Sequence, residues 1–365
     1  MLDALVIADD LTGACDAAVA FRRRGMETIV AVGSGIVERT GGKVLGLSTD
    51  SRDLGPAEAE ARVRSSATQF TERPRVLFKK IDSLLRGNAG WEIRAALDAF
   101  GCEVAILTPA FPEMHRIVRN GLLYLEGVPD WRPIDVQAHL KSQGLEHLVH
   151  VQCEAVQDAI RRGSRYISVE TTCNQDLEVI TRSALESGKR ILWAGSAGLA
   201  AAVAAGLDQA GCGAAAGRER PSASGRPVLF CIGTNHSITA IQVLELLQRR
   251  PCRRCDQGKI APQVREHVIL TISPDASPQQ LREDLARIPD TFGAVLLSGG
   301  RTAALICQAL GIKAIKLEGE IVTGLPWGFP EGGTWENFPV ATKSGAFGET
   351  DALVRVADFF SCPQN

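Results

Sequence analysis

The sequence has little of what marks membrane proteins and nucleic-acid-binding proteins. Aromatic residues make up 5% of the chain, and no uninterrupted apolar run reaches the roughly 18 residues of a membrane span. The net charge of -2 provides no basic surface for a phosphate backbone. Two carboxylates and no basic segment stand near the start, so we expect no secretory signal. These absences predict a cytoplasmic protein that binds neither membranes nor nucleic acid.

Several widespread motifs are missing as well. The chain contains no Gly-x-x-x-x-Gly-Lys-Ser/Thr sequence, no Gly-x-Gly-x-x-Gly after a strand, no Gly-x-Ser-x-Gly and no His-Glu-x-x-His. The ten cysteines are scattered, as expected of reduced thiols. Cys252 and Cys255 have no second pair or histidine nearby, so we interpret them as part of a surface loop and predict no metal there.

Short aliphatic runs that alternate with longer amphipathic stretches predict an α/β fold. The length suits two domains, and residues 208–227 lose all periodicity and fill with Gly, Ala, Ser and Pro. We predict an N-terminal domain over 1–207, a linker over 208–227 and a C-terminal domain over 228–365, each a mostly parallel sheet flanked by helices. The predicted strands are Ala4–Ala8, Thr28–Val32, Val44–Leu47, Val76–Lys79, Val104–Leu107, Arg190–Trp193, Val228–Ile232, Val268–Ile272 and Ala294–Leu297.

Two adjacent carboxylates, Asp9 and Asp10, directly follow the first predicted strand. Ligands of open parallel sheets bind beyond the carboxyl ends of the strands. A carboxylate pair there can bind a cation, accept hydrogen bonds from a polyol or provide a general base. Helix capping by Asp10 or Thr12 is the structural alternative, but capping accounts for one acid and not for the pair.

A strongly polar segment follows the fourth predicted strand. It contains Lys80, Asp82, Ser83 and Arg86, a mixture that fits an anionic ligand with hydroxyl groups. The alternative is a solvated loop with a helix cap at Asp82 or Ser83. Arg52 follows the third strand and would join the same rim, unless it is an ordinary surface arginine.

Turns of small residues in the second half of the chain indicate a phosphate site. Such turns expose backbone N–H groups and direct a helix dipole at an anion. Glycine in a tight strand-to-helix turn is also simple geometry, and the Gly-rich segment near the C-terminus can equally be a plain loop. The candidate nucleotide-binding residues are Gly233, Thr234, Ser298, Gly299, Gly300, Thr302, Lys343, Ser344, Gly345 and Gly348.

Five segments, taken in chain order, form a recognisable series. They are Ala8-Asp9-Asp10-Leu11-Thr12-Gly13-Ala14, Lys79-Lys80-Ile81-Asp82-Ser83 with Arg86-Gly87-Asn88, Pro109-Ala110-Phe111-Pro112, Ser298-Gly299-Gly300 with Thr302-Ala303, and Lys343-Ser344-Gly345-Ala346-Phe347-Gly348. Over nearly the whole chain this series resembles that of the four-carbon acid sugar kinase family. The resemblance implies an N-terminal substrate domain and a C-terminal nucleotide domain, which phosphorylate the terminal hydroxyl of threonate, erythronate or 3-oxo-tetronate with ATP and Mg²⁺.

The residues and the resemblance together suggest a division of roles. Arg52, Lys80 and Arg86 would neutralise the substrate carboxylate. Asp10 and Asp82 would hold its hydroxyls, and one of the two would act as general base. The C-terminal turns would hold ATP, with Mg²⁺ bridging its phosphates and no metal ligand assigned. Further predicted substrate contacts are Asp9, Ser83 and Arg116.

Two other classes of function stay open. A non-catalytic sugar-acid-binding or sensor protein would use the same cleft without nucleotide turnover, and Arg301 favours it because an acidic residue usually follows the Gly-Gly turn in the family. A nicotinamide-dependent dehydrogenase is disfavoured because the first strand ends in Asp-Asp, which would repel a pyrophosphate. The sequence leaves open which sugar acid is the substrate, which of Asp10 and Asp82 is the base, and whether the protein forms a homodimer.

Overall fold

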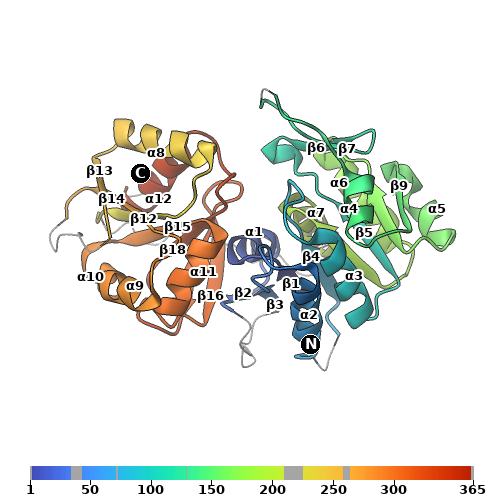
Figure 1. Ribbon diagram of the computed structural model, residues 1–365, viewed down its shortest axis with the longest axis horizontal. Coiled ribbons are helices and arrows are strands. Elements are labelled where there is room, and N and C mark those ends of the chain that lie inside the picture. Colours follow the sequence, from blue (N-terminus) through green and yellow to red (C-terminus); the bar gives the residue numbers. More distant parts are fainter. Residues whose placement is uncertain are drawn as a thin grey trace.

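The chain folds into two lobes that lie side by side, as the computed structural model in Figure 1 shows. The structure describes residues 2–33, 43–70, 73–128, 130–208, 225–257 and 264–362. Of the predicted linker, residues 209–224 lie outside the described residues. Within the described ranges no helix is both long and apolar enough to pass through a membrane.

The N-terminal lobe alternates strands and helices, as the periodicity predicts. Two short 3-10 helices, Pro112–Met114 and Cys153–Ala155, complete it. Its elements are β1 (Ala4–Ala8), α1 (Leu11–Arg22), β2 (Thr28–Ala31), β3 (Val44–Ser48), α2 (Pro56–Ala67), β4 (Val76–Lys80), α3 (Ala89–Ala99), β5 (Val104–Thr108), β6 (Arg116–Arg119), β7 (Leu122–Leu125), β8 (Ile134–Asp135), α4 (Val136–Ser142), β9 (Leu148–Val151), α5 (Val156–Arg161), β10 (Tyr166–Val169), α6 (Asn174–Leu185), β11 (Ile191–Gly195) and α7 (Ala197–Asp208).

The C-terminal lobe follows the same alternation and ends in three strands and a helix. The elements of this lobe are β12 (Val228–Ile232), α8 (Ser237–Arg249), β13 (Cys252–Cys255), β14 (His267–Thr271), α9 (Pro278–Leu285), α10 (Ile288–Thr291), β15 (Ala294–Ser298), α11 (Gly300–Ala309), β16 (Ala314–Glu320), β17 (Pro326–Glu331), β18 (Val340–Lys343) and α12 (Ala352–Ser361).

One sheet of 15 strands runs through both lobes, in the order β13-β14-β12-β15-β18-β17-β16-β2-β3-β1-β4-β11-β5-β10-β9. Pairing is parallel from β13 to β18 and again from β2 to β9. The pairs β18·β17, β17·β16 and β16·β2 are antiparallel and join the two parallel parts, with Val30 opposite Ile315. The predicted α/β fold is confirmed.

The sequence predictions fall short at antiparallel and edge strands, and they also missed the inner parallel strand β10. Strands β6, β7 and β8 form a separate three-stranded sheet that was not predicted. Cys252 and Cys255 form edge strand β13, so their interpretation as a surface loop is wrong. The segment is held extended because it pairs in parallel with His267–Leu270, and both thiols are free.

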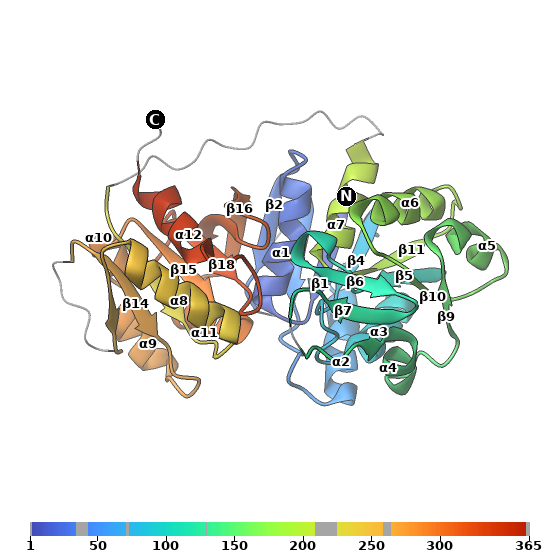
Figure 2. The ribbon, with the colours of Figure 1, turned by 90° about the horizontal axis from the view of Figure 1, so that it is seen from above.

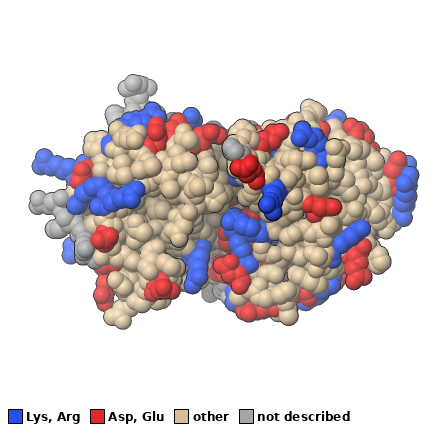
Figure 3. Space-filling model, turned by 45° about the horizontal axis from the view of Figure 1, so that its top comes forward, with Lys and Arg blue, Asp and Glu red and all other residues tan. Residues whose placement is uncertain are grey.

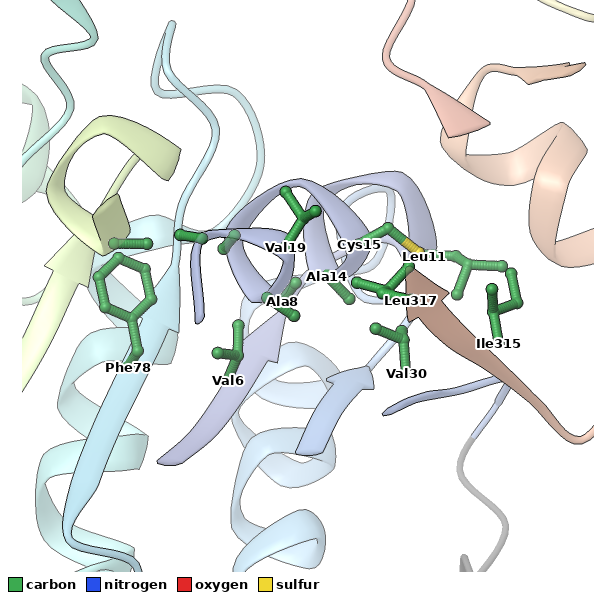
Figure 4. Close-up of a cluster of buried hydrophobic side chains, with 14 of the residues drawn as sticks. Val6, Ala8, Leu11, Ala14, Cys15, Val19, Val30, Phe78, Ile315 and Leu317 are labelled. Atoms are coloured by element: carbon green, nitrogen blue, oxygen red, sulfur yellow. The ribbon is translucent and has the colours of Figure 1, made fainter. Parts of the chain in front are cut away.

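Helix α1 is buried from Leu11 to Phe21 and lies where the lobes meet, as Figures 1 and 2 show. Ala14 and Cys15 belong to the hydrophobic cluster of Figure 4, which also includes Val30 of β2 and Leu317 of β16. Small side chains on this helix let strands of both lobes approach it closely. The Asp9-Asp10 turn that precedes α1 is therefore fixed at the junction of the lobes.

Candidate active site

A cleft of about 1140 Å³ lies between the lobes, beside the start of α1 and of α11. Figure 3 shows basic and acidic side chains gathered along the groove between the lobes. The N-terminal lobe lines the cleft with Asp9, Asp10, Asp50, Arg52, Asp53, Leu54, Arg62 and Arg86, and the C-terminal lobe with Gly233, Thr234, Asn235, Pro274, Asp275, Ala276, Ser277, Pro278, Gly299, Gly300, Arg301, Thr302, Ala304, Leu305 and Gln308.

Arg52 connects three carboxylates at the wall formed by the N-terminal lobe. Its Nε and Nη2 atoms each donate a 2.8 Å hydrogen bond to Asp9, and its Nη1 atom donates to Asp10. Its Nη2 atom also lies 3.8 Å from Asp82 Oδ2. Burial alone would lower the pKa of Arg52, but the three acids raise it, so the guanidinium stays charged. One arginine thus holds together the turns that follow β1, β3 and β4.

Asp10 and Asp82, the two candidate bases, have opposite electrostatic environments. Arg86 donates to both oxygens of Asp82, at 3.0 Å from Nε and 2.6 Å from Nη2. Burial opposes ionisation of Asp82, but the hydrogen bond from Arg86 and the charge of Arg52 outweigh burial and lower its pKa. Burial raises the pKa of Asp10 even with Arg52 beside it. Only Asp10 of the two lines the cleft.

Asp10 also reaches across to the C-terminal lobe. A Cβ atom at Gly300 would collide with the Asp10 carboxylate, so glycine at the first residue of α11 permits this close approach. The Asp10 carboxylate in addition caps α1, accepting hydrogen bonds from Gly13 N and, at 3.2 Å, from Thr12 Oγ1. Asp10 is therefore both a helix cap and the carboxylate that lies at the start of α11.

The small-residue turns predicted in the second half of the chain come together on the other wall. Gly233 N donates to Ser298 O at 3.2 Å, and Gly299 N donates to Lys343 O at 2.9 Å. A Cβ atom at Gly233 would meet Thr302, which shows how closely the turns after β12 and β15 pack. The first residues of α11, Gly300 to Thr302, line the cleft at this point, and the start of a helix is suited to an anion.

Buried side chains bind the backbone carbonyls of the loop after β18. Lys343 is fully buried, and its Nζ atom donates to Thr239 Oγ1, Ser344 O and Gly345 O at 3.0 to 3.3 Å. Burial lowers the pKa of Lys343 to about 7. Gln242 Nε2 donates to three further carbonyls of the loop, those of Phe347, Gly348 and Glu349. The Lys343 amine supports the loop, and a contact with nucleotide stays a prediction.

Three predicted substrate contacts are absent from the described cleft lining. Lys80 Nζ donates to Ile81 O at 3.0 Å and lies 3.7 Å from Asp16. Arg116 donates to Ala346 O at 3.0 Å and to Met114 O, and its guanidinium lies over the Phe347 ring, 5.3 Å from the centroid. Ser83 is buried in the turn after β4. The structure brings Asp9, Asp10, Arg52 and Arg86 to the cleft, and substrate binding by the other three stays a prediction.

Glu92 is a buried residue of this region that the sequence predictions missed. Its carboxylate lies 2.8 Å from Lys79 Nζ and accepts a hydrogen bond from Ser51 Oγ, next to Arg52. Burial raises the pKa of Glu92. A charged residue among the apolar positions of α3 is the sequence signal that identifies such a network. The network fixes the loop that carries Arg52.

Known protein families match both halves of the chain. A family described as "Sugar-binding N-terminal domain" matches residues 4–139 and 134–203, and one described as "Nucleotide-binding C-terminal domain" matches residues 276–353. A D-threonate kinase of Bordetella bronchiseptica is 31% identical over 402 residues, with 96% of each chain covered. The chain belongs to the four-carbon acid sugar kinase family. It is accordingly a kinase, a phosphotransferase with an alcohol group as acceptor.

Relatives within the four-carbon acid sugar kinase family differ in the acid they are named for. A D-erythronate kinase of Heliobacterium modesticaldum is 25% identical, with 98% of this chain and 97% of the relative covered. A 3-oxo-tetronate kinase of Brucella melitensis is 26% identical, with coverage of 94% and 92%.

Solved structures support the fold of this family. A protein from Salmonella typhimurium LT2 superposes with a TM-score of 0.78 at 21% identity, with 99% of this chain and 100% of the other covered. A Bordetella bronchiseptica protein, a domain-swapped dimer with bound citrate, superposes with a TM-score of 0.50 at 28% identity, with coverage of 99% and 98%.

Asp16, on the buried face of α1, gives this kinase a testable pH dependence. Burial raises the pKa of Asp16 to about 7 from a reference of 3.8, despite the charge of Lys80. Between these pH values the folded protein holds a proton on Asp16 that the unfolded chain releases. Asp16 therefore makes the folded state less stable as pH rises, and the unfolding equilibrium constant increases by up to about tenfold per pH unit. Asp16→Asn removes the titration. The stability of Asp16→Asn relative to wild type is expected to increase between pH 5 and pH 8, measured by urea unfolding, and a constant difference would contradict the shift.

Proposed function

We propose that this kinase transfers the γ-phosphoryl group of ATP to the terminal hydroxyl of a four-carbon sugar acid. The observation that carries the proposal is the meeting of Asp10 and Arg52 with the start of α11 in one cleft between the lobes. Acid recognition groups and a backbone anion site thereby face the same space. The names of the relatives, D-threonate, D-erythronate and 3-oxo-tetronate kinase, support a four-carbon acid as the acceptor.

The acid is proposed to bind at the wall formed by residues 1–207. Arg86 lines the cleft with about half of its side chain exposed, and Asp82 takes only part of its hydrogen-bonding capacity. The remaining N–H groups of Arg86 can bind the substrate carboxylate, since a guanidinium has five donors. Arg52 lies beside it and orients Asp9 and Asp10 toward the substrate hydroxyls. The other predicted contacts, Lys80, Ser83 and Arg116, would act from behind this wall.

Residues 228–365 are proposed to bind the nucleotide, with 208–227 as the linker between the two domains. The turns at Gly233, Gly299 and Gly345 would surround the phosphates. The donors would be the first backbone N–H groups of α11, since those of Gly233 and Gly299 already bind the Ser298 and Lys343 carbonyls. Asp9 and Asp10 are already engaged by Arg52, and no group of three or more His, Cys, Asp or Glu in the described ranges is placed to hold a metal ion. This donor set fits a Mg²⁺ ion that is held mainly by the phosphates and neutralises their charge.

Asp10 is proposed as the general base. It lines the cleft, its pKa is raised, and it lies against the start of α11, where the γ-phosphate would be placed. Asp10 would take the proton of the attacking hydroxyl while the two lobes hold that oxygen in line with the phosphorus. Asp82, with its lowered pKa, would accept hydrogen bonds and keep Arg86 in place.

We also propose an oligomeric state and a cellular location for the kinase. One relative of known structure is a domain-swapped dimer, which supports a homodimer here. We propose that it works in the cytoplasm, where ATP and small metabolic acids are available.

ADP release with Mg-ATP, measured against a panel of four-carbon sugar acids, tests the proposed function. The panel holds both enantiomers of threonate and erythronate and the 3-oxo-tetronates. Turnover with one member well above the others is the expected result, because the cleft fixes both the carboxylate and the hydroxyls. Binding of an acid by calorimetry without ADP release would instead favour the non-catalytic sensor.

A further inference from the structure

The arginines that the N-terminal lobe contributes to the cleft are already paired with carboxylates. Arg52 binds Asp9 and Asp10, and Arg86 binds Asp82. Arg62 lies 3.2 Å from Glu58. Carboxylates of the same lobe therefore neutralise most of their positive charge. The phosphates of a nucleotide need a cation from elsewhere.

The C-terminal lobe contributes a single cationic side chain to the described lining of the cleft, that of Arg301. Arg301 is the second residue of α11, is exposed, and forms no ion pair with another described residue. Asp275 is the one carboxylate that this lobe adds to the lining. Without Arg301, the part of the cleft lining that the C-terminal lobe contributes would thus carry a net negative charge. Lys343 does not substitute for it, because its amine is buried and donates to Thr239 and to the carbonyls of its own loop.

We propose that Arg301 binds the phosphate groups of the nucleotide and sets the affinity of the C-terminal lobe for them. This inference rests on the proposed function. The start of α11 supplies backbone N–H groups from one side, and the Arg301 guanidinium supplies a charged, bidentate donor from the same turn. The unpaired guanidinium is free to do so since no internal salt bridge has to break.

The test is the affinity of wild type and variants for ADP and for adenosine, measured by calorimetry. Arg301→Ala is expected to weaken ADP binding by roughly 10- to 100-fold, the loss typical of a charge-assisted hydrogen bond to a phosphate. Arg301→Glu should weaken it further, and Arg301→Lys should retain part of it. Adenosine carries no phosphate, so its affinity should not change in any variant. Binding of the sugar acid should also stay at the wild-type value.

Arg287→Ala is the matched control, because it removes an exposed arginine of the same lobe that pairs with Asp290 outside the cleft lining. Arg287→Ala should bind ADP as wild type does. Thermal unfolding without nucleotide should be the same for Arg301→Ala and wild type, since no internal partner is lost. Wild-type affinity for ADP in Arg301→Ala, or an equal loss for adenosine, would overturn the role of Arg301 alone. A wild-type protein that binds no adenine nucleotide would overturn the proposed function and this role with it.

Discussion

Asp10→Asn is expected to lower kcat by roughly 10²- to 10⁴-fold, the usual contribution of a general base. Asparagine keeps the size of the side chain and can still accept the Gly13 hydrogen bond that caps α1. It cannot take a proton from the attacking hydroxyl. Activity of the wild type should fall as pH drops through the raised pKa of Asp10, and the residual activity of the variant should lack that limb.

Two further variants make the assignment of the base specific. Asp53→Asn changes an exposed carboxylate that lines the same cleft and should leave kcat within a few-fold of wild type. Asp82→Asn should mainly raise KM for the sugar acid, because Arg86 loses the carboxylate that orients it. Steady-state kinetics with the preferred acid measures all three. Near wild-type kcat in Asp10→Asn, or a larger loss in Asp82→Asn, would show that the base is not Asp10.

Most strands of the parallel parts are predictable because they are runs of buried aliphatic residues, several of them followed by an amphipathic helix; β10, β13 and β18 are exceptions. Strands β16 and β17 break this pattern. β16 alternates Ile315, Lys316 and Leu317, and β17 contains Pro326 and Pro330, which ordinarily argue against a strand. Pairing of β16 with β2 joins segments nearly 300 residues apart in the chain, and no local signal specifies it.

Local sequence indicates which turns lie near the cleft, but it does not indicate where each side chain of those turns points. Asp9, Asp10, Arg52 and Arg86 follow strands and reach the cleft, as the geometry of parallel sheets predicts. Lys80 follows β4 equally directly, yet its amine lies near Asp16 of α1, and this depends on how the helix packs on the sheet. The pair of Asp82 and Arg86 is local, four residues apart, whereas the contacts of Arg52 with Asp10 and Asp82 join separate turns and depend on the tertiary fold.

Arg52→Ala is expected to destabilise the folded protein by about 3 to 5 kcal/mol, the usual cost of removing one partner from a buried ion pair. The exposed fraction of the side chain is 3% for Asp9 and 10% for Asp10, so both acids are left buried without the charge that compensates them. Activity should be lost as well, because the turns after β1, β3 and β4 are no longer tied together. Arg52→Lys should recover part of the stability and little activity, since an ammonium cannot bind Asp9 through two parallel hydrogen bonds.

The loss of stability in Arg52→Ala should become smaller as pH falls from 8 to 5. Arg52 lowers the pKa of Asp9 against the effect of burial, so without it the pKa values of both buried acids rise in the folded state. As pH falls, the variant then gains more protons on folding than the wild type does, so its stability rises relative to the wild type; the contribution of Asp16 is common to both and cancels in the comparison. Urea unfolding at pH 8 and pH 5 measures this gap, the difference in free energy of unfolding between the wild type and Arg52→Ala. Arg161→Ala breaks an exposed ion pair of the same lobe and should cost less than about 1 kcal/mol at either pH. A gap that stays constant with pH would mean that Arg52 does not stabilise the protein through the charges of Asp9 and Asp10.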